Sequence, residues 1–242
     1  MSAAQRTGYL APEGLLDQLT AELADVESVH GRLVLAKGAE QPSVWAENVW
    51  RDGEKVRAVS IGEAARLLKA RQRNWWPYAH TLHRRTRLLQ EQLPYVGARP
   101  VVFPSLAPTV PLGSFMWIDQ ETMLVAADCA SPFPNGAPRF AEHQVGPPSR
   151  AYLKLWEALL RLGRWPRQGE TCLDLGASPG GWTWARARLG ARVKAYDRAE
   201  LDPTVRTLAG VETVVGDAFL AKPEAVGAVD WLFSDVVCCP ER

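Results

Sequence analysis

The chain has 242 residues, of which 28 are Lys or Arg, 27 are Asp or Glu and four are Cys. This length allows one or two domains with a buried core, and 47% apolar with 23% charged residues excludes a disordered or fibrous protein. No apolar run approaches the roughly 20 residues of a membrane span, and the first residues lack the apolar segment of a secretory signal. We therefore expect a cytoplasmic protein with no membrane association.

The N-terminal part mixes helical and strand patterns. Leucines at helical spacing predict a helix over 12–26 with Pro12 at its first position, followed by strands at 32–36 and 43–50 and by helices near 61–71 and 77–92. Ten of the 18 prolines then fall between Pro94 and Pro148, which is typical of an irregular connector. Two apolar runs in it, 114–118 and 122–127, predict a β-hairpin. We expect a small α+β accessory domain over 1–92 and a proline-rich connector over 93–148.

From residue 149 the pattern changes to alternating helices and strands. A helix is expected from 149 to 163 and another from Gly181, and strands near 171–175, 192–196, 213–215 and 230–234. Such alternation is typical of a parallel α/β sheet. The sequence therefore predicts an α/β domain over 149–242.

The near-neutral total charge conceals an uneven distribution. Residues 1–100 hold 14 basic and 11 acidic residues, and the rest of the chain holds 14 and 16. Between Glu63 and Glu91 there is no acid but there are seven basic residues, with Trp75 and Trp76 among them. Because Arg and Lys neutralise phosphates and exposed aromatic rings stack on bases, this window is a candidate RNA-binding segment. We expect the contacts to come from Arg71, Arg73, Arg84, Arg85 and Arg87.

A simpler interpretation of that window is a solvated pair of amphipathic helices with the tryptophans in the core, since tryptophan is more often packed than displayed. The four cysteines have no metal-ligand spacing, so no metal site is expected.

The run TCLDLGASPGGWTW, residues 171–184, is typical of a nucleoside-binding turn. A strand leads to Asp174 and is followed by clustered glycines, which let a ligand approach the backbone at the carboxyl edge of a sheet. Asp197 follows 23 residues after Asp174, where an acid can accept hydrogen bonds from ribose hydroxyls. Asp217 ends the next apolar run. The alternative is that these are ordinary turn glycines or a generic nucleotide-binding unit.

The letters D-L-G-A-S-P-G-G-W resemble the S-adenosylmethionine loop of the FtsJ-type ribosomal RNA 2′-O-ribose methyltransferases. The resemblance implies a Rossmann-like fold with S-adenosylmethionine as cofactor. The cofactor-binding residues that it implies are Asp174, Gly176, Ser178, Pro179, Gly180, Gly181, Trp182, Asp197 and Asp217.

Two further stretches resemble the catalytic elements of that family. The run SRAYLKLWE at 149–157 is similar to a helix whose lysine is catalytic, which puts Lys154 in that role. The run DWLFSD at 230–235 is similar to the strand that ends in the catalytic aspartate, which matches Asp235. Without the resemblance, Lys154 would be interpreted as a solvated helix lysine and Asp235 as a turn acid.

The stretch 135–155 is similar to a bacterial branch of the family that modifies a cytidine in large-subunit rRNA. The resemblance thus implies 2′-O-ribose methylation of RNA, with large-subunit rRNA as partner. Two features depart from that branch. About 50 proline-rich residues stand where it has an RNA-binding THUMP domain, and the second lysine and the glutamate of the catalytic tetrad have no match before Arg242. We therefore expect a C-terminally truncated enzyme with only the first half of the sheet.

Two alternatives follow from these departures. The chain could be a non-catalytic remnant that binds RNA or S-adenosylmethionine. It could also be an RNA 5-methylcytosine methyltransferase that uses Cys238 or Cys239 as nucleophile. The second alternative is disfavoured because Val236 and Val237 follow Asp235 where those enzymes place Pro-Cys, and because Trp182 replaces their usual lysine.

Overall fold

The structure is a computed structural model that describes residues 5–236. The chain divides into two compact units, which we treat separately. The N-terminal unit holds the described residues up to 100 together with 108–139, and the C-terminal unit holds 101–107 and the described residues from 140 onward. Over the part of the chain that is described, no helix combines the length and apolar character needed to cross a membrane.

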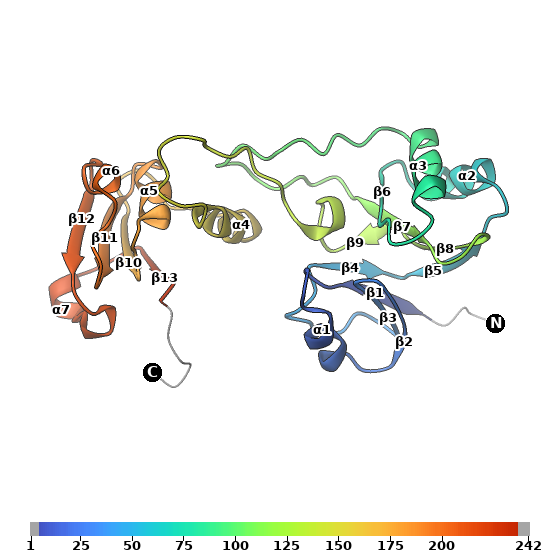
Figure 1. Cartoon of the computed structure of the whole chain (residues 1–242), viewed down its shortest axis with the longest axis horizontal. Helices are drawn as coiled ribbons and strands as arrows, with labels where there is room; N and C mark the ends of the chain where they lie inside the picture. Colours follow the sequence, from blue (N-terminus) through green and yellow to red (C-terminus); the bar gives the residue numbers. More distant parts are fainter. Residues whose placement is uncertain (1–4, 237–242) are drawn as a thin grey trace. The chain divides into compact units, whose positions relative to one another are not determined.

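The first sheet of the N-terminal unit has the strand order β2-β3-β1-β4-β9, and all its neighbours are antiparallel (Figure 1). Its strands are β1 (Arg6–Leu10), β2 (Val26–His30), β3 (Leu33–Lys37), β4 (Asn48–Arg51) and β9 (Asp128–Cys129). Helix α1 (Leu16–Glu22) packs on one face, where Leu19 is buried against Tyr9 and Val34. Alternate residues of β1 and β3 point to opposite faces, as the two-residue period of a strand requires.

The second sheet has the order β5-β8-β7-β6 and is covered by two helices. Its elements are β5 (Glu54–Arg57), α2 (Ile61–Arg71), β6 (Trp75–Pro77), α3 (His83–Gln92), β7 (Gly113–Trp117) and β8 (Thr122–Ala126). Met116 and Leu124 face Trp50 of the first sheet, whereas Phe115 and Trp117 pack in the same cluster as the buried residues of α2 and α3. The unit therefore consists of two stacked sheets with helices outside them.

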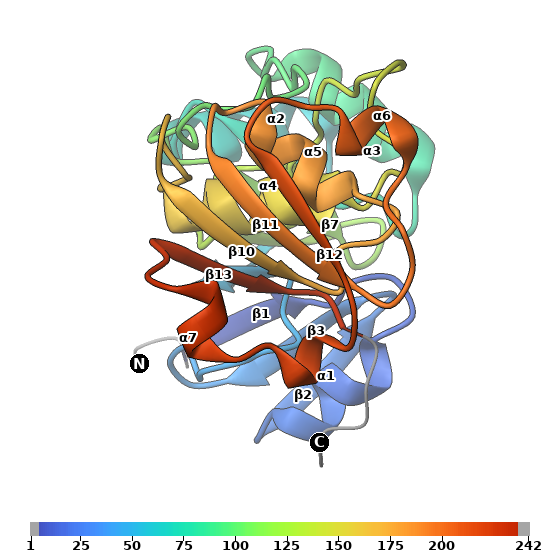
Figure 2. The same cartoon turned by 90° about the vertical axis from the view of Figure 1, so that its left-hand side faces the viewer.

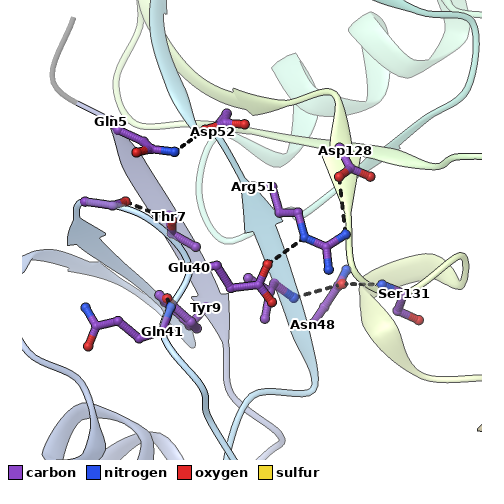
Figure 3. Close-up of polar contacts among 12 residues, drawn as sticks. Gln5, Thr7, Tyr9, Glu40, Gln41, Asn48, Arg51, Asp52, Asp128 and Ser131 are labelled. Atoms are coloured by element: carbon purple, nitrogen blue, oxygen red, sulfur yellow. Dashed lines mark hydrogen bonds and ion pairs between the residues drawn. The ribbon is translucent and has the colours of Figure 1, made fainter.

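Polar contacts bind the segment 128–136 to the first sheet (Figure 3). Arg51 forms ion pairs with Glu40 at 2.6 Å and with Asp128 at 3.2 Å. The buried Asn48 accepts a hydrogen bond from the backbone of Ser131 at 3.0 Å. Ser131 in turn donates to the carbonyl of Gly136, so this return segment is held by side chains as well as by β9.

The predicted hairpin forms, but it lies at the centre of the second sheet, between β5 and β6. It therefore belongs to the N-terminal unit rather than to a separate connector over 93–148. The helix predicted over 77–92 begins only at His83. Trp75–Pro77 pair with β7 instead, and Leu82 has a left-handed backbone with a φ of 50°. The N-terminal helix is likewise shorter than predicted and leaves Pro12 outside.

The C-terminal unit contains a parallel sheet of order β12-β11-β10-β13 (Figure 2). Its elements are α4 (Tyr152–Leu162), β10 (Thr171–Leu175), α5 (Gly181–Ala187), β11 (Arg192–Asp197), α6 (Pro203–Arg206), β12 (Val211–Val215), the short 3-10 helix η2 (Ala218–Leu220), α7 (Pro223–Val226) and β13 (Trp231–Ser234). A second 3-10 helix, η1 (Pro134–Gly136), belongs to the N-terminal unit. These four strands confirm the strands predicted from the sequence. Parallel strands place their carboxyl ends at one edge, where the residues that follow them meet.

Helices α4 and α5 cover one face of this sheet. The face is apolar because Tyr152, Trp156 and Trp184 pack with Ala195 of β11. Helix α4 has buried residues at Tyr152, Leu155, Trp156, Leu159 and Leu160, which is the helical spacing that the sequence predicts. Its Lys154 lies off this buried stripe and its side chain is exposed. The packing therefore fixes the helix while leaving the lysine accessible.

Candidate functional site

A cavity of about 290 Å³ lies at the carboxyl edge of the parallel sheet. Its lining comes from the segments that follow β10, β11, β12 and β13, namely Gly176, Ser178, Asp197, Arg198, Asp217, Ala218, Phe219, Asp235 and Val236. The volume is near the lower end of the range for small-molecule sites. Residues up to 60 positions apart along the chain, Gly176 and Val236, meet here because the topology is parallel.

The glycine turn after β10 forms one wall of the cavity. Gly176 has a φ of +79°, a conformation that residues with a side chain rarely adopt, and a Cβ there would lie 2.9 Å from Val236 Cγ2. The backbone N–H of Ser178 donates to Asp197 Oδ2 at 2.9 Å, and the Ser178 hydroxyl donates to the carbonyl of Glu200. The turn is therefore tied to the end of β11.

Asp197 and Asp217 present carboxylates at two neighbouring strand ends. Asp197 also accepts a hydrogen bond from the backbone of Ala199 at 2.8 Å, and Asp217 accepts one from Phe219 at 3.0 Å. Each Asp197 oxygen thus has one backbone donor, and a carboxylate has about four acceptor positions in total. Asp197 therefore keeps capacity to accept hydroxyl donors from a ligand.

Asp174 lies under the turn, not at the cavity surface. It is only 1% exposed, accepts a hydrogen bond from the Thr183 hydroxyl at 2.6 Å and forms an ion pair with the fully buried Arg186. Burial raises the pKa of Asp174, and the Arg186 charge and the Thr183 hydroxyl oppose the rise. Burial lowers the pKa of Arg186, which its ion pair with Asp174 opposes. This pair supports the turn from below.

Four other residues of the predicted cofactor loop also lie outside the cavity lining. Pro179, Gly180 and Gly181 form the entry to α5, where Gly180 has a φ of +114° and approaches Val205 of α6. Trp182 packs edge-to-face on Phe233 and donates through Nε1 to the carbonyl of Ala151 at 2.9 Å. Of the nine predicted cofactor residues, the structure gathers Gly176, Ser178, Asp197 and Asp217 around the cavity.

Lys154 and Asp235, 81 positions apart in the sequence, lie together. Lys154 Nζ is 3.9 Å from Asp235 Oδ2, and Asp235 itself lines the cavity. Their side chains are 72% and 47% exposed, so water and a large ligand can reach both. The pair combines a cation and a carboxylate beside a cavity, an arrangement that can orient a hydroxyl group and stabilise negative charge on its oxygen.

Four lining residues were missed by the sequence reasoning, namely Arg198, Ala218, Phe219 and Val236. Arg198 and Phe219 are the two with large side chains beside the predicted acids. Each follows a predicted acid by one or two positions, and Phe219 is 48% exposed although it is aromatic. Their proximity to Asp197 and Asp217 was a usable signal, because residues just after a strand end face the same edge. The sequence does not show that Arg198 forms an ion pair with Asp217.

The five arginines predicted to contact RNA differ in their surroundings. Arg71 forms an ion pair with Glu54 at 2.6 Å, and Arg87 lies 3.6 Å from Glu91. Arg85 stacks over Trp117 at 4.2 Å and donates to the carbonyls of Ala58 and Val59, just before α2. Arg73 and Arg84 are exposed and form no ion pair with the residues that the structure describes.

The two tryptophans of the basic window differ as well. Trp75 is 1% exposed and donates through Nε1 to backbone carbonyls of α2 and its C-cap, so it is a core residue. Trp76 is half-buried. Cys238 and Cys239 lie outside the described residues. Within those residues there is no cluster of three or more His, Cys, Asp and Glu side chains arranged to hold a metal.

Comparison with known proteins matches the C-terminal unit to one family. Residues 147–241 match the family model described as FtsJ-like methyltransferase. Several similar curated proteins are named "Ribosomal RNA large subunit methyltransferase M". The protein of that name from Halorhodospira halophila is 44% identical over 112 residues, 45% of this chain and 32% of the relative.

Two other relatives of that name cover more of the chain. The protein from Azoarcus sp. is 36% identical over 166 residues, 65% of this chain and 44% of the relative. The protein from Marinobacter nauticus is 37% identical over 134 residues, 52% of this chain and 37% of the relative. The chain matches less than half the length of each. The resemblance to the FtsJ-like methyltransferases predicted from the sequence is thereby confirmed over residues 147–241.

Proposed function

We propose that this chain takes part in S-adenosylmethionine-dependent methylation of a ribose 2′-hydroxyl in RNA. The observation that carries the proposal is the placement of Lys154 within 3.9 Å of Asp235, at a cavity whose other walls are Asp197, Asp217 and a glycine turn. A lysine–carboxylate pair beside a nucleoside-sized cavity suits the activation of a hydroxyl group. The match of residues 147–241 to FtsJ-like methyltransferases supports the same chemistry.

The residues of the cavity fit an adenosine-containing cofactor. Asp197 can accept hydrogen bonds from ribose hydroxyls, and Asp217 lies at the adjacent strand end. The exposed ring of Phe219 offers an apolar surface to a purine, and Gly176 leaves the backbone accessible. S-adenosylmethionine, when bound, would supply an electrophilic methyl group on a sulfonium.

The reaction needs a positioned hydroxyl more than it needs a strong base. A ribose 2′-hydroxyl is a weak nucleophile at neutral pH, and correct alignment alone can lower the barrier substantially. In the proposed role, the Lys154 ammonium faces the hydroxyl oxygen and stabilises the negative charge that develops on it. The hydroxyl proton is released to water, which can reach this exposed pair. Asp235 holds that ammonium in place by ion pairing and accepts hydrogen bonds at the cavity edge.

The proposed substrate is a cytidine in large-subunit rRNA. The names of the relatives support large-subunit rRNA, and the resemblance of 135–155 supports the cytidine. Arg73 and Arg84, both exposed, are the first candidates for phosphate contacts, with Arg71 and Arg87 available if their ion pairs rearrange. A protein that modifies rRNA works where ribosomes are assembled, so the proposal includes a cytoplasmic location.

The test combines binding and transfer. S-adenosylmethionine binding is measured by calorimetry, and transfer of a labelled methyl group is measured on transcribed large-subunit rRNA. A methylated 2′-oxygen can no longer attack the adjacent phosphate, so the modified position resists alkaline cleavage and identifies the reaction. We expect binding, transfer and loss of transfer in Lys154→Ala and Asp235→Ala.

The other outcomes distinguish the alternatives. Binding without transfer would support the non-catalytic remnant. Transfer that survives both substitutions would refute the proposed roles of Lys154 and Asp235. A methyl group on cytosine C5, lost in Cys238→Ser or Cys239→Ser, would instead favour the cysteine mechanism.

A further inference from the structure

We propose that Arg198 sets the affinity of the cavity for its nucleoside ligand by competing for Asp217. The inference rests on the proposed function, because it concerns the same cavity. Arg198 lines that cavity, follows Asp197 directly in the chain and forms an ion pair with Asp217 Oδ2. It is the one basic residue in the cavity lining that the structure describes.

The contacts of Asp217 show why the pair matters. Its Oδ1 accepts a hydrogen bond from the backbone of Phe219 at 3.0 Å, and its Oδ2 is held by the Arg198 guanidinium. Each carboxylate oxygen therefore has one donor, as in Asp197, but the donor on Oδ2 of Asp217 is a charged guanidinium and not a backbone N–H. A ligand amine that donates to Oδ2 shares this oxygen with Arg198, and the charged donor weakens the hydrogen bond that the neutral amine can form.

The ion pair is exposed enough to be displaced. The Arg198 side chain is 66% exposed and that of Asp217 is 26% exposed. Exposed pairs contribute little to stability and are weakened by salt. A purine 6-amino group is neutral, so its hydrogen bond to a carboxylate depends less on ionic strength than the ion pair does. If Arg198 and the ligand amine compete for Asp217, the affinity for the ligand should rise when salt or substitution of Arg198 weakens the Arg198–Asp217 ion pair.

The chain offers a matched control at the neighbouring helix. Arg206 of α6 pairs with Glu200 at 2.9 Å, with side-chain exposures of 38% and 67%, and neither residue lines the cavity. Arg206→Ala removes the same charge near the same edge without altering Asp217. Arg198→Ala and Arg206→Ala should both fold as the parent chain does, which circular dichroism verifies.

The experiment uses the full chain and three probes: S-adenosylmethionine, adenosine, and purine riboside, which lacks the 6-amino group. Arg198→Ala should tighten adenosine and S-adenosylmethionine binding by about twofold to fivefold, the factor that corresponds to an exposed ion pair. Purine riboside binding and every affinity of Arg206→Ala should stay unchanged. Added NaCl should tighten adenosine binding to the parent chain but not to Arg198→Ala.

Several results would overturn the inference while leaving the proposed function intact. One is unchanged or weaker adenosine binding in Arg198→Ala, and another is an equal gain for purine riboside. A third is the same gain in Arg206→Ala, which would indicate a general charge effect. If none of the three probes binds the parent chain, the proposed function fails and the inference fails with it.

Discussion

Two ion pairs lie at the ends of neighbouring strands in the C-terminal unit and differ in almost every physical respect. Asp174 belongs to β10 and pairs with Arg186, and both side chains are at most 1% exposed. Asp235 follows β13, which is hydrogen-bonded to β10, and pairs with Lys154 in contact with water. The difference teaches that depth below the sheet edge decides whether a charge pair supports the fold or is available to a ligand.

The buried pair is costly to form and more costly to break. Arg186 Nε and Nη1 have no hydrogen-bond partner in the described structure, although the guanidinium lies over the Phe233 ring at 4.3 Å. A desolvated charge whose partner is removed is left without compensation. The exposed pair has no such penalty, since water replaces whichever partner is lost.

The largest expected effect is on folding and comes from the buried pair. Arg186→Ala should destabilise the C-terminal unit by about 3–5 kcal/mol, because Asp174 is left buried and unpaired. Urea unfolding monitored by tryptophan fluorescence measures the change. The double variant Arg186→Leu with Asp174→Leu removes both charges and should recover part of the loss. A single variant as stable as the parent would show that the pair does not hold the turn.

Breaking the exposed Lys154–Asp235 pair should affect activity and leave stability nearly unchanged. Lys154→Ala and Asp235→Ala should each lower methyl transfer by about 10²–10³-fold, the range for the loss of one group that stabilises negative charge on a reacting oxygen. Their unfolding free energies should change by less than about 1 kcal/mol. Initial rates at saturating rRNA, measured beside urea curves, test both statements. Comparable loss of stability and activity would mean that this pair is structural as well.

The same contrast applies to two adjacent residues of the N-terminal unit. Arg84→Ala should weaken RNA binding and reduce the magnitude of its salt slope by about one, with little change in stability. Arg85→Ala should cost about 1–2 kcal/mol of stability, because it loses the Trp117 stacking and two carbonyl contacts. Filter binding across a salt series separates the two variants. Equal effects of Arg84→Ala and Arg85→Ala on RNA affinity would contradict the assignment of Arg84 to RNA binding and of Arg85 to stability.

The smallest effect concerns the thiols. Burial raises the pKa of both Cys129 and Cys172 to about 11, so at pH 8 almost all of each thiol is protonated and unreactive. In a Cys238→Ser, Cys239→Ser variant, reaction with a thiol reagent should be slow in the native protein and rapid in denaturant. The native rate should rise as the pH approaches 11. Rapid reaction at pH 8 would show that these thiols are accessible thiolates.

The sequence predicted the C-terminal unit better than the N-terminal one. Each parallel strand is a short apolar run that ends at or is followed by an acid or a glycine. The positions of Asp197 and Asp217 at the ends of β11 and β12 could therefore be predicted from the sequence. The N-terminal unit depends on pairing between distant segments. β5 pairs with β8 some 68 positions later, and nothing local in either strand specifies that register.

Exposure of individual side chains was the other quantity that the sequence could not supply. The sequence motif places Asp174 and Trp182 in the predicted cofactor loop. It does not indicate that Asp174 is buried beneath the turn or that Trp182 lies against the start of α4. Arg84 and Arg85 are also adjacent residues of the same type, so the sequence does not distinguish them. Their surroundings differ because successive residues of a helix are rotated by about 100° around its axis. Only the packing shows which arginine meets Trp117.

The hydrogen bond from Trp182 to the carbonyl of Ala151 has a consequence for the geometry of the proposed reaction. It joins the first turn of α5 to the residue that precedes α4, three positions before Lys154. The lysine and the glycine turn that lines the cavity belong to different segments, and this indole joins them. In the proposed reaction, substituting Trp182 would therefore change the distance between Lys154 and the cavity without removing any of the residues proposed to act on the hydroxyl.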